Sequence, residues 1–260
     1  MNILFSAIRG VCLAIFLPLM SSASAISSEL ESLTFFTENY PPANFESNGQ
    51  LTGYSVDILR AAGEAVGQDI KLQQISIFPW PRSYRNTLNM DNTVLFSTTR
   101  TEHREDLFQW VGPITDIRVV VMARKQDNIT ITNPIDMGRY KIGVIRDDIG
   151  EQSLLQLGIP MDSMQEAMSV TTLAEQLMKE RIELLAYAEK AAYWWSKQAG
   201  INSDLFEVVY VLEEGYLYYA FNNNVDKKAL KQLQKGLDII KSQKNENGMT
   251  IHQEILSRYR

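Results

Sequence analysis

The residues with the clearest capacity to bind a charged group lie in one polar run that reads STTRTEHRED, from Ser97 to Asp106. The run follows a predicted strand that ends at Phe96, so we interpret it as a turn. Hydroxyl groups followed by arginines can surround an anionic oxygen, and a guanidinium matches a carboxylate with two parallel hydrogen bonds. An alternative is a helix start with exposed ion pairs. The candidate ligand groups are Ser97, Thr98, Thr99 and Arg104.

Two aromatic residues in other turns are suited to covering a small molecule. Tyr40, beside Pro41 and Pro42, combines a flat face with a hydroxyl that can make one hydrogen bond. Trp80, in the segment FPWPR, could form a wall of the same site. Both could equally be core residues of rigid turns.

Charged candidates follow two predicted strands in the second half of the chain. Arg146 and Asp148 lie between a strand and a helix N-terminus, where free backbone N–H groups attract anions. Asp148 would itself compete with an anion, and it could simply cap the helix. After the next strand come Tyr187 and Glu189, of which Glu189 could meet a cationic group.

The residue inventory gives little support to catalysis. The chain has two histidines and one cysteine, Cys12, so it offers neither a histidine-rich metal site nor a nucleophilic thiol beyond the amino-terminal segment. Glu38, Asp148 and Glu189 could form an acid–base pair only if burial raised a pKa. We therefore expect no metal, no cofactor and no catalytic residues.

The amino-terminal 25 residues have the pattern of a cleaved signal peptide. Arg9 precedes the apolar run Val11–Met20, and Ala23-Ser24-Ala25 offers small residues for cleavage near Ala25. The run is too short for a membrane helix, which needs about 20 apolar residues. Without Arg9 the net charge changes from −6 to −7, which disfavours nucleic acid as a partner. We expect a periplasmic monomer stabilised by core burial rather than by disulfides.

Strand and helix patterns alternate, which predicts an α/β protein. A helix over Ser55–Val66 follows from its apolar stripe, and the spacing Thr172-x-x-Glu175 predicts a capping box. Further helices are predicted after Asp148, through Leu230–Ile240 and near Ile251–Tyr259. The predicted strands are Leu33–Phe36, Ile70–Ile75, Thr93–Phe96, Arg118–Ala123, Ile142–Ile145, Leu184–Tyr187, Val208–Leu212 and Leu217–Phe221.

The alternation restarts in mid-chain, which predicts two lobes and two connections between them. Extended segments near Gly112–Arg118 and Leu212–Tyr218 would be the connections. Lobe one would comprise residues 26–115 with 216–260, and lobe two residues 116–215. Ligands of open α/β sheets bind outside the carboxyl ends of strands, so the turns after Phe36, Phe96, Ile145 and Tyr187 would line a cleft between the lobes.

The chain resembles the family-3 extracellular solute-binding proteins, the periplasmic components of amino-acid ABC transporters. The resemblance implies a type II periplasmic binding fold that closes by hinge motion. It implies that Arg104 grips a ligand carboxylate, with Ser97 and Thr99 beside it, and that Tyr40 stacks on the ligand. The segments that carry it are Thr37-Glu38-x-Tyr40-Pro41-Pro42, Gly53–Leu59, Ser97–Thr99 with Thr101-x-x-Arg104, Ile142–Val144 and Leu217–Phe221.

The chain departs from amino-acid binders of this family at three places. Asp147-Asp148-Ile149 stands where a Gly-Thr-Thr segment is usual, and Ala43 replaces an aromatic residue. Ala188, with Glu189 next to it, stands where an aspartate usually holds the ligand ammonium. The identity of the ligand stays open.

The leading hypothesis is therefore a binding protein for a small polar or carboxylated, amino-acid-like solute that serves a membrane permease of an ABC importer. One alternative is a ligand-sensing partner of a membrane signalling protein. Another is an enzyme on the same fold, as in periplasmic dehydratases.

Overall fold

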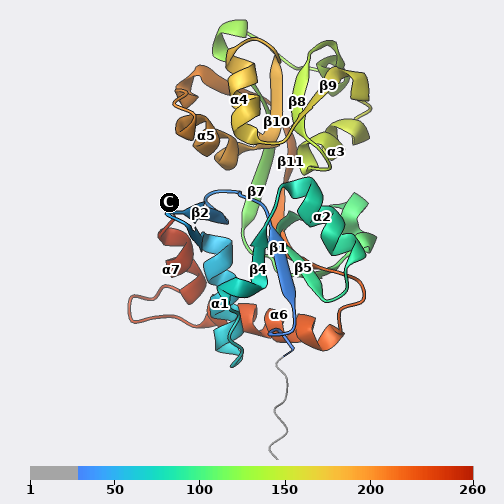
Figure 1. Ribbon diagram of the computed structural model, residues 1–260. Helices are drawn as coiled ribbons and strands as arrows, with labels where there is room; N and C mark the ends of the chain where they lie inside the picture. Colours follow the sequence, from blue (N-terminus) through green and yellow to red (C-terminus); the bar gives the residue numbers. More distant parts are fainter. Residues whose placement is uncertain (1–28, 260) are drawn as a thin grey trace, which may run out of the picture.

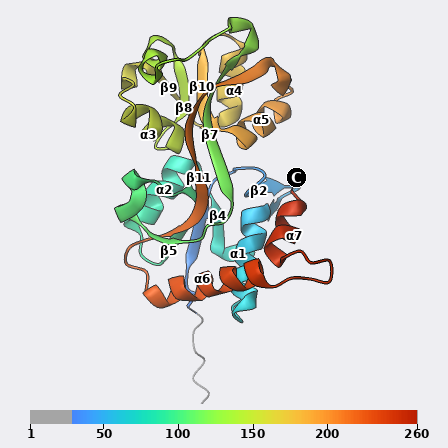
Figure 2. The same ribbon diagram turned by 180° about the vertical axis from the view of Figure 1, so that it is seen from behind.

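The computed structural model describes residues 29–259, which form two α/β lobes stacked end to end (Figure 1). The predicted signal peptide lies outside the described residues. Two strands, β7 (Asp116–Arg124) and β11 (Phe206–Phe221), run between the lobes in both views (Figures 1 and 2). Within residues 29–259, no helix combines the length and apolar character that a membrane span requires.

Lobe one is built on a sheet in the order β4-β1-β5-β11, with β6 also paired to β11. β1 is parallel to β4 and β5, whereas β11 is antiparallel to β5 and β6. A hairpin of β2 and β3 lies beside the sheet. The bounds are β1 Thr34–Thr37, β2 Phe45–Ser47, β3 Gln50–Thr52, β4 Ile75–Ile77, β5 Thr93–Thr99, β6 Gln109–Val111, α1 Tyr54–Ala65, α2 Trp80–Asn89, α6 Lys227–Ser242 and α7 Ile251–Ser257.

Lobe two continues the sheet in the order β11-β7-β10-β8-β9, with helices packed on both faces (Figure 1). β8 is parallel to both β9 and β10, and β7 is antiparallel to β10. The bounds are β8 Ile142–Ile145, β9 Met164–Ala167, β10 Leu184–Ala188, α3 Ile149–Gln156, α4 Val170–Met178 and α5 Glu189–Gln198. Short 3₁₀ turns occupy Leu72–Gln74, Glu102–Leu107, Lys125–Asp127, Pro134–Arg139, Met161–Ser163 and Ser203–Leu205.

The two strands predicted over Val208–Leu212 and Leu217–Phe221 are one continuous strand, β11, which corrects the prediction. Its first part pairs with β7 as far as Tyr216, and its second part pairs with β5 from Leu217 onward. The polar residues between the two apolar segments do not end the strand, because the chain is paired with a neighbouring strand before and after them. We propose the lobe boundaries given by the sequence, near residues 115 and 216, because β11 changes partner there.

Two other local predictions are wrong. Residues 70–74 do not form a strand: a 3₁₀ turn covers Leu72–Gln74, and the Gln74 amide donates to three backbone carbonyls near Leu30 and so holds that turn. Helix α4 is capped by Ser169, whose hydroxyl accepts a hydrogen bond from the Thr172 N–H, rather than by Thr172. Because α4 begins at Val170 rather than after Thr172, it buries the apolar side chain of Val170 as well. Helix α2, which was not predicted, begins at Trp80 with a proline in its first turn.

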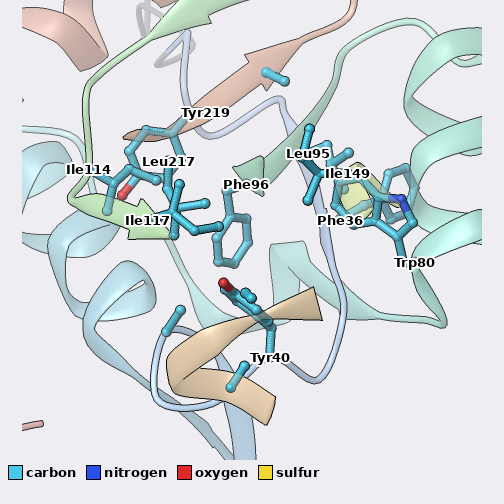
Figure 3. Close-up of a cluster of buried hydrophobic side chains, with 14 of the residues drawn as sticks. Phe36, Tyr40, Trp80, Leu95, Phe96, Ile114, Ile117, Ile149, Leu217 and Tyr219 are labelled. Carbon is cyan, nitrogen blue, oxygen red and sulfur yellow. The ribbon is translucent and has the colours of Figure 1, made fainter. Parts of the chain in front are cut away.

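The hydrophobic core extends across the contact between the lobes. Figure 3 shows part of one cluster of buried side chains, with Phe96 and Tyr219 from the lobe-one sheet near Ile117 of β7. Ile149, the first residue of α3 in lobe two, lies in the same cluster as Phe36 and Trp80 of lobe one. The lobes therefore contact each other through apolar as well as polar groups.

The close packing of α1 on α6 gives a stability prediction. A Cβ added at Gly236 of α6 would lie 1.9 Å from the Ala62 carbonyl oxygen, so Gly236→Ala must force the helices apart. We expect a loss of about 3 kcal/mol in the free energy of unfolding, measured by urea denaturation. The matched control is Gly215→Ala, whose Cβ would have no neighbour nearer than 3.7 Å. Equal stability of the two variants would contradict the prediction.

Candidate ligand-binding site

A small polar cavity lies between the lobes at the carboxyl ends of strands from both sheets. Its volume is about 10 Å³, which is room for about one water molecule. β1, β5, α2 and the 102–107 turn supply its lobe-one side, and β10 and the start of α3 supply its lobe-two side. The lining residues are Glu38, Tyr40, Trp80, Ser97, Thr99, Arg104, Ile117, Asp148, Ile149, Tyr187 and Ala188.

Arg104 is the most unusual of these residues, because its side chain is charged and 0% exposed. Its guanidinium donates to Gln152 Oε1 at 2.9 Å, to the Asp147 carbonyl at 3.2 Å and to the Thr99 carbonyl at 3.3 Å. Its central carbon also lies 5.2 Å from the ring centroid of Trp80. Within residues 29–259 it forms no ion pair with a carboxylate. Burial lowers the pKa of Arg104, but an arginine stays charged at neutral pH.

Two carboxyl groups lie in the same cavity. Glu38 follows β1, and its Oε1 accepts a hydrogen bond of 3.4 Å from the Tyr187 hydroxyl. Burial, and then the negative charge of Asp148, raises the pKa of Glu38 well above its ordinary value. Burial also raises the pKa of Asp148, while Arg104 opposes the rise. The cavity thus holds two acids for one arginine, and neither acid forms an ion pair with any of the described residues.

The backbone carbonyl of Asp147 in lobe two accepts hydrogen bonds from both lobes. It accepts from Trp80 Nε1 at 2.8 Å, from Arg104 and from Gln152 Nε2 at 3.1 Å. Asp147 has a left-handed φ of 58°, a conformation that Asp tolerates better than most residues. Beside this contact the rings of Tyr40 and Tyr187 meet edge to face, with centroids 6.0 Å apart. These contacts hold the lobes together around the cavity.

The floor of the cavity is a network of buried hydroxyl and amide groups on lobe one. Ser97 Oγ donates to Asn44 Oδ1 and lies 2.8 Å from Ser55 Oγ. Asn44 Nδ2 in turn donates to Thr37 Oγ1 and to the Glu38 carbonyl, both at 2.7 Å. The network connects β5, the start of α1 and the turn that carries Glu38, so it holds those segments in place.

Seven of the ten candidate residues border the cavity: Tyr40, Trp80, Ser97, Thr99, Arg104, Asp148 and Tyr187. Asp148 also caps α3 by accepting from the Gly150 N–H at 3.3 Å, so the capping interpretation is right as well. Arg104 faces inward from the 3₁₀ turn, whereas Arg100 pairs at the surface with Glu105. The alternative prediction, that the arginines of this run form exposed ion pairs, is therefore right for Arg100 and wrong for Arg104.

The structure places three candidates away from the cavity. Thr98 is fully buried but does not line the cavity, and β5 is irregular beside it, with a left-handed φ of 59° at Ser97 and a register shift against β11. Arg146 is exposed and pairs with Glu166 on β9. Glu189 pairs with Arg118 at 2.5 Å. Ser97–Thr99, predicted as a turn, are the last three residues of β5, because Leu217 and Tyr218 of β11 extend the pairing to Thr99.

Four residues of the cavity wall were not among the ten candidate ligand groups, although the sequence analysis considered Glu38 as a possible acid or base. Glu38 directly follows β1, and the strand-end rule that selected the neighbouring turn could have selected it as a ligand group. Ile117 and Ile149 carry no chemical signal, and only the approach of the two lobes makes them part of a site. Ala188 lies at the position that the family resemblance associated with the ligand ammonium group. Within residues 29–259, no cluster of three or more His, Cys, Asp or Glu side chains could hold a metal ion.

The family model of the bacterial extracellular solute-binding proteins, family 3, matches residues 33–248. The chain therefore belongs to this family, as the sequence resemblance predicted. Membership of an extracellular family indicates that it acts outside the cytoplasm, in the periplasm or as a secreted protein. No curated protein matches the chain in sequence.

Solved structures confirm the predicted type II periplasmic binding fold. A histidine kinase sensor domain with similarity to periplasmic binding proteins superposes with a TM-score of 0.75 at 18% identity, covering 88% of this chain and 95% of that one. An ancestral arginine-binding protein bound to arginine gives 0.71 at 18% identity, covering 88% and 98%. The substrate-binding protein of an amino acid ABC transporter gives 0.68 at 16% identity, covering 87% and 98%.

The raised pKa of Glu38 predicts a pH-dependent stability. Because the pKa of Glu38 is higher in the folded than in the unfolded chain, its contribution to stability is largest below its ordinary pKa and is lost as the pH rises toward the folded-state pKa. We expect Glu38→Gln to raise the free energy of unfolding at pH 7.5 by about 1–3 kcal/mol and to leave it unchanged at pH 4.

Urea denaturation at the two pH values measures this difference. The matched control is Glu46→Gln, at an exposed residue of the neighbouring hairpin. A loss of stability in Glu38→Gln at pH 7.5 would contradict the prediction.

Proposed function

We propose that the protein is a periplasmic binding protein that closes its two lobes on a small amino-acid-like solute and delivers it to an ABC importer. The observation that carries the proposal is Arg104, a fully buried cation that has no ion-pair partner among residues 29–259 and lines a cavity between the lobes. A buried charge is costly unless it is paired, so this position favours a ligand that supplies an anion.

A carboxylate is the anion that fits this position best. The planar guanidinium can donate two parallel hydrogen bonds to the two oxygens of a carboxylate, a geometry that a point charge does not offer. Ser97 and Thr99, which also border the cavity, offer hydroxyl and backbone groups beside the guanidinium. Charge-assisted hydrogen bonds of this kind contribute about 1.5–3 kcal/mol each.

The two acids in the cavity favour an amine on the same ligand. Glu38 and Asp148 both bear raised pKa values, so an ammonium group between them would stabilise their charged forms. A zwitterionic ligand would place its carboxylate against Arg104 and its ammonium group against Glu38 and Asp148. In amino-acid binders of the family an aspartate holds the ligand ammonium group, and this chain has Ala188 at that position. Glu38 would bind the ammonium group instead.

Ligand entry requires the lobes to separate. A volume of about 10 Å³ is far smaller than an amino acid, and Trp80 and Arg104 bridge to Asp147 across the gap. We infer that β7 and β11, the two strands between the lobes, bend to open the cleft and that a ligand replaces part of these contacts.

Delivery to an importer agrees with the similarity to the substrate-binding protein of an amino acid ABC transporter. The protein would be exported with cleavage near Ala25, act as a monomer and dock on a membrane permease. The similarity to a histidine kinase sensor domain favours a second candidate, in which the closed protein reports to a membrane sensor. Pull-down with the permease or with the sensor ectodomain distinguishes the two partners.

Catalysis remains a further candidate because burial raises the pKa of Glu38, the condition for a general acid. Turnover of a bound ligand by the purified protein, followed by mass spectrometry, would favour this candidate. A ligand recovered unchanged supports binding alone.

A thermal-shift screen against amino acids, dicarboxylates, polyamines, sugars and short peptides tests the proposed function. A ligand at about 100 times its Kd adds about 2.7 kcal/mol to stability, which we expect to raise the Tm by roughly 5–10 °C. We expect amino acids to be the class that shifts the Tm. A shift by sugars and not by amino acids would contradict the proposal.

Arg104→Ala tests the carboxylate contact directly. We expect it to weaken amino-acid binding at least tenfold, measured by calorimetry, because it removes charged hydrogen bonds in a dehydrated site. The matched control is Arg100→Ala, which removes an exposed arginine four residues away. Circular dichroism confirms that both variants fold, and equal affinity of the two would exclude Arg104 from the site.

A further inference from the structure

A second, larger cavity lies beside the polar one. Its volume is about 280 Å³, and Glu38 and Trp80 line both cavities. Phe78, which directly follows β4, is part of its lobe-one wall, whereas Met168, Val170 and Trp195 are part of its lobe-two wall. Because both lobes supply walls, the cavity depends on the same approach of the lobes as the polar cavity does.

The chemistry of this second cavity differs from that of the first. Its walls are mainly aromatic and aliphatic, and among the described residues that line it Glu38 alone is charged. An apolar cavity of about 150 Å³ is large enough to bind benzene, so 280 Å³ can hold a phenyl or indole ring. Apolar walls favour an apolar group by the surface they remove from water.

Glu38 lies at the junction of the two cavities. Its carboxyl group is close to Tyr187 and Asp148 on the polar side, and the residue also borders the apolar side. A ligand whose ammonium group meets Glu38 and whose carboxylate meets Arg104 would therefore direct its side chain past Trp80 toward the second cavity.

We propose that the second cavity receives the side chain of the ligand, and that the protein selects amino acids with a bulky apolar, ring-bearing side chain. The proposal rests on the proposed function, since it assumes that Arg104 and the two acids hold the amino-acid group. The chain is also similar in fold to an ancestral arginine-binding protein. A preference of the second cavity for a basic side chain is therefore the main alternative that the experiment must distinguish.

Calorimetry with the purified protein and L-phenylalanine, L-tryptophan, L-alanine and L-arginine tests the proposal. We expect the two aromatic amino acids to bind about tenfold or more tightly than L-alanine, the size of effect that burying a ring produces. L-arginine should bind no more tightly than L-alanine. Tighter binding of L-arginine than of L-phenylalanine overturns the proposal.

Met168→Asp connects this preference to the cavity. Met168 is 74% exposed at the rim, so the substitution does not threaten the fold, but it places a charge beside the apolar walls. We expect about a fivefold loss of L-phenylalanine affinity and an unchanged affinity for L-alanine. Met161→Asp is the matched control, at a methionine of the same lobe that is 48% exposed and does not line the cavity.

Three results separate the inference from the function on which it rests. Selective loss of L-phenylalanine binding in Met168→Asp, with Met161→Asp unaffected, supports the inference. Equal affinity for all four amino acids, abolished by Arg104→Ala, overturns the inference and leaves the proposed function standing. Absence of binding by any amino acid in the unmodified protein overturns both.

Discussion

The burial of the Arg104 guanidinium is the constraint on which the arrangement of this protein depends. A buried cation without an ion-pair partner among the described residues is expensive, and here carbonyl and amide oxygens and two aromatic faces offset that cost. Two of these oxygen acceptors, Gln152 Oε1 and the Asp147 carbonyl, belong to the opposite lobe. The solvation of one side chain is therefore linked to the relative position of the lobes, which is the property that a closing binding protein needs.

The strand β11 connects the two lobes covalently and is paired in both of them. It is a member of the lobe-two sheet as far as Tyr216 and of the lobe-one sheet from Leu217 onward. With β7 it forms the two-stranded connection between the lobes that we propose to bend when the cleft opens. The acids are distributed in the same way, with Glu38 on one lobe and Asp148 on the other. Approach of the lobes brings like charges together, and this repulsion adds to the burial that raises the pKa of Glu38. A ligand ammonium group would relieve the repulsion.

Much of the fold follows from local sequence pattern. Apolar runs predicted β5, β7, β8 and β10 in the right places, because residues of these strands are buried whichever neighbours they pair with. The errors occur where pairing or capping overrides local signals. Ser97–Thr99 continue a strand because β11 extends past them, and residues 72–74 form a 3₁₀ turn because the Gln74 side chain bonds to a distant segment.

The sequence by itself determined which residue types could recognise a carboxylate and at which strand ends to look for them, since strand ends of an α/β sheet share one edge. Only the tertiary structure decided which of those residues face the cavity between the lobes. Arg100 and Arg104 are chemically equal and four residues apart, yet one pairs with Glu105 at the surface and the other is buried between the lobes. Arg146 and Glu189 found surface partners, whereas Glu38 lies in the cavity. The reason is that burial and charge pairing depend on the approach of two lobes through distant chain segments, which no local pattern encodes.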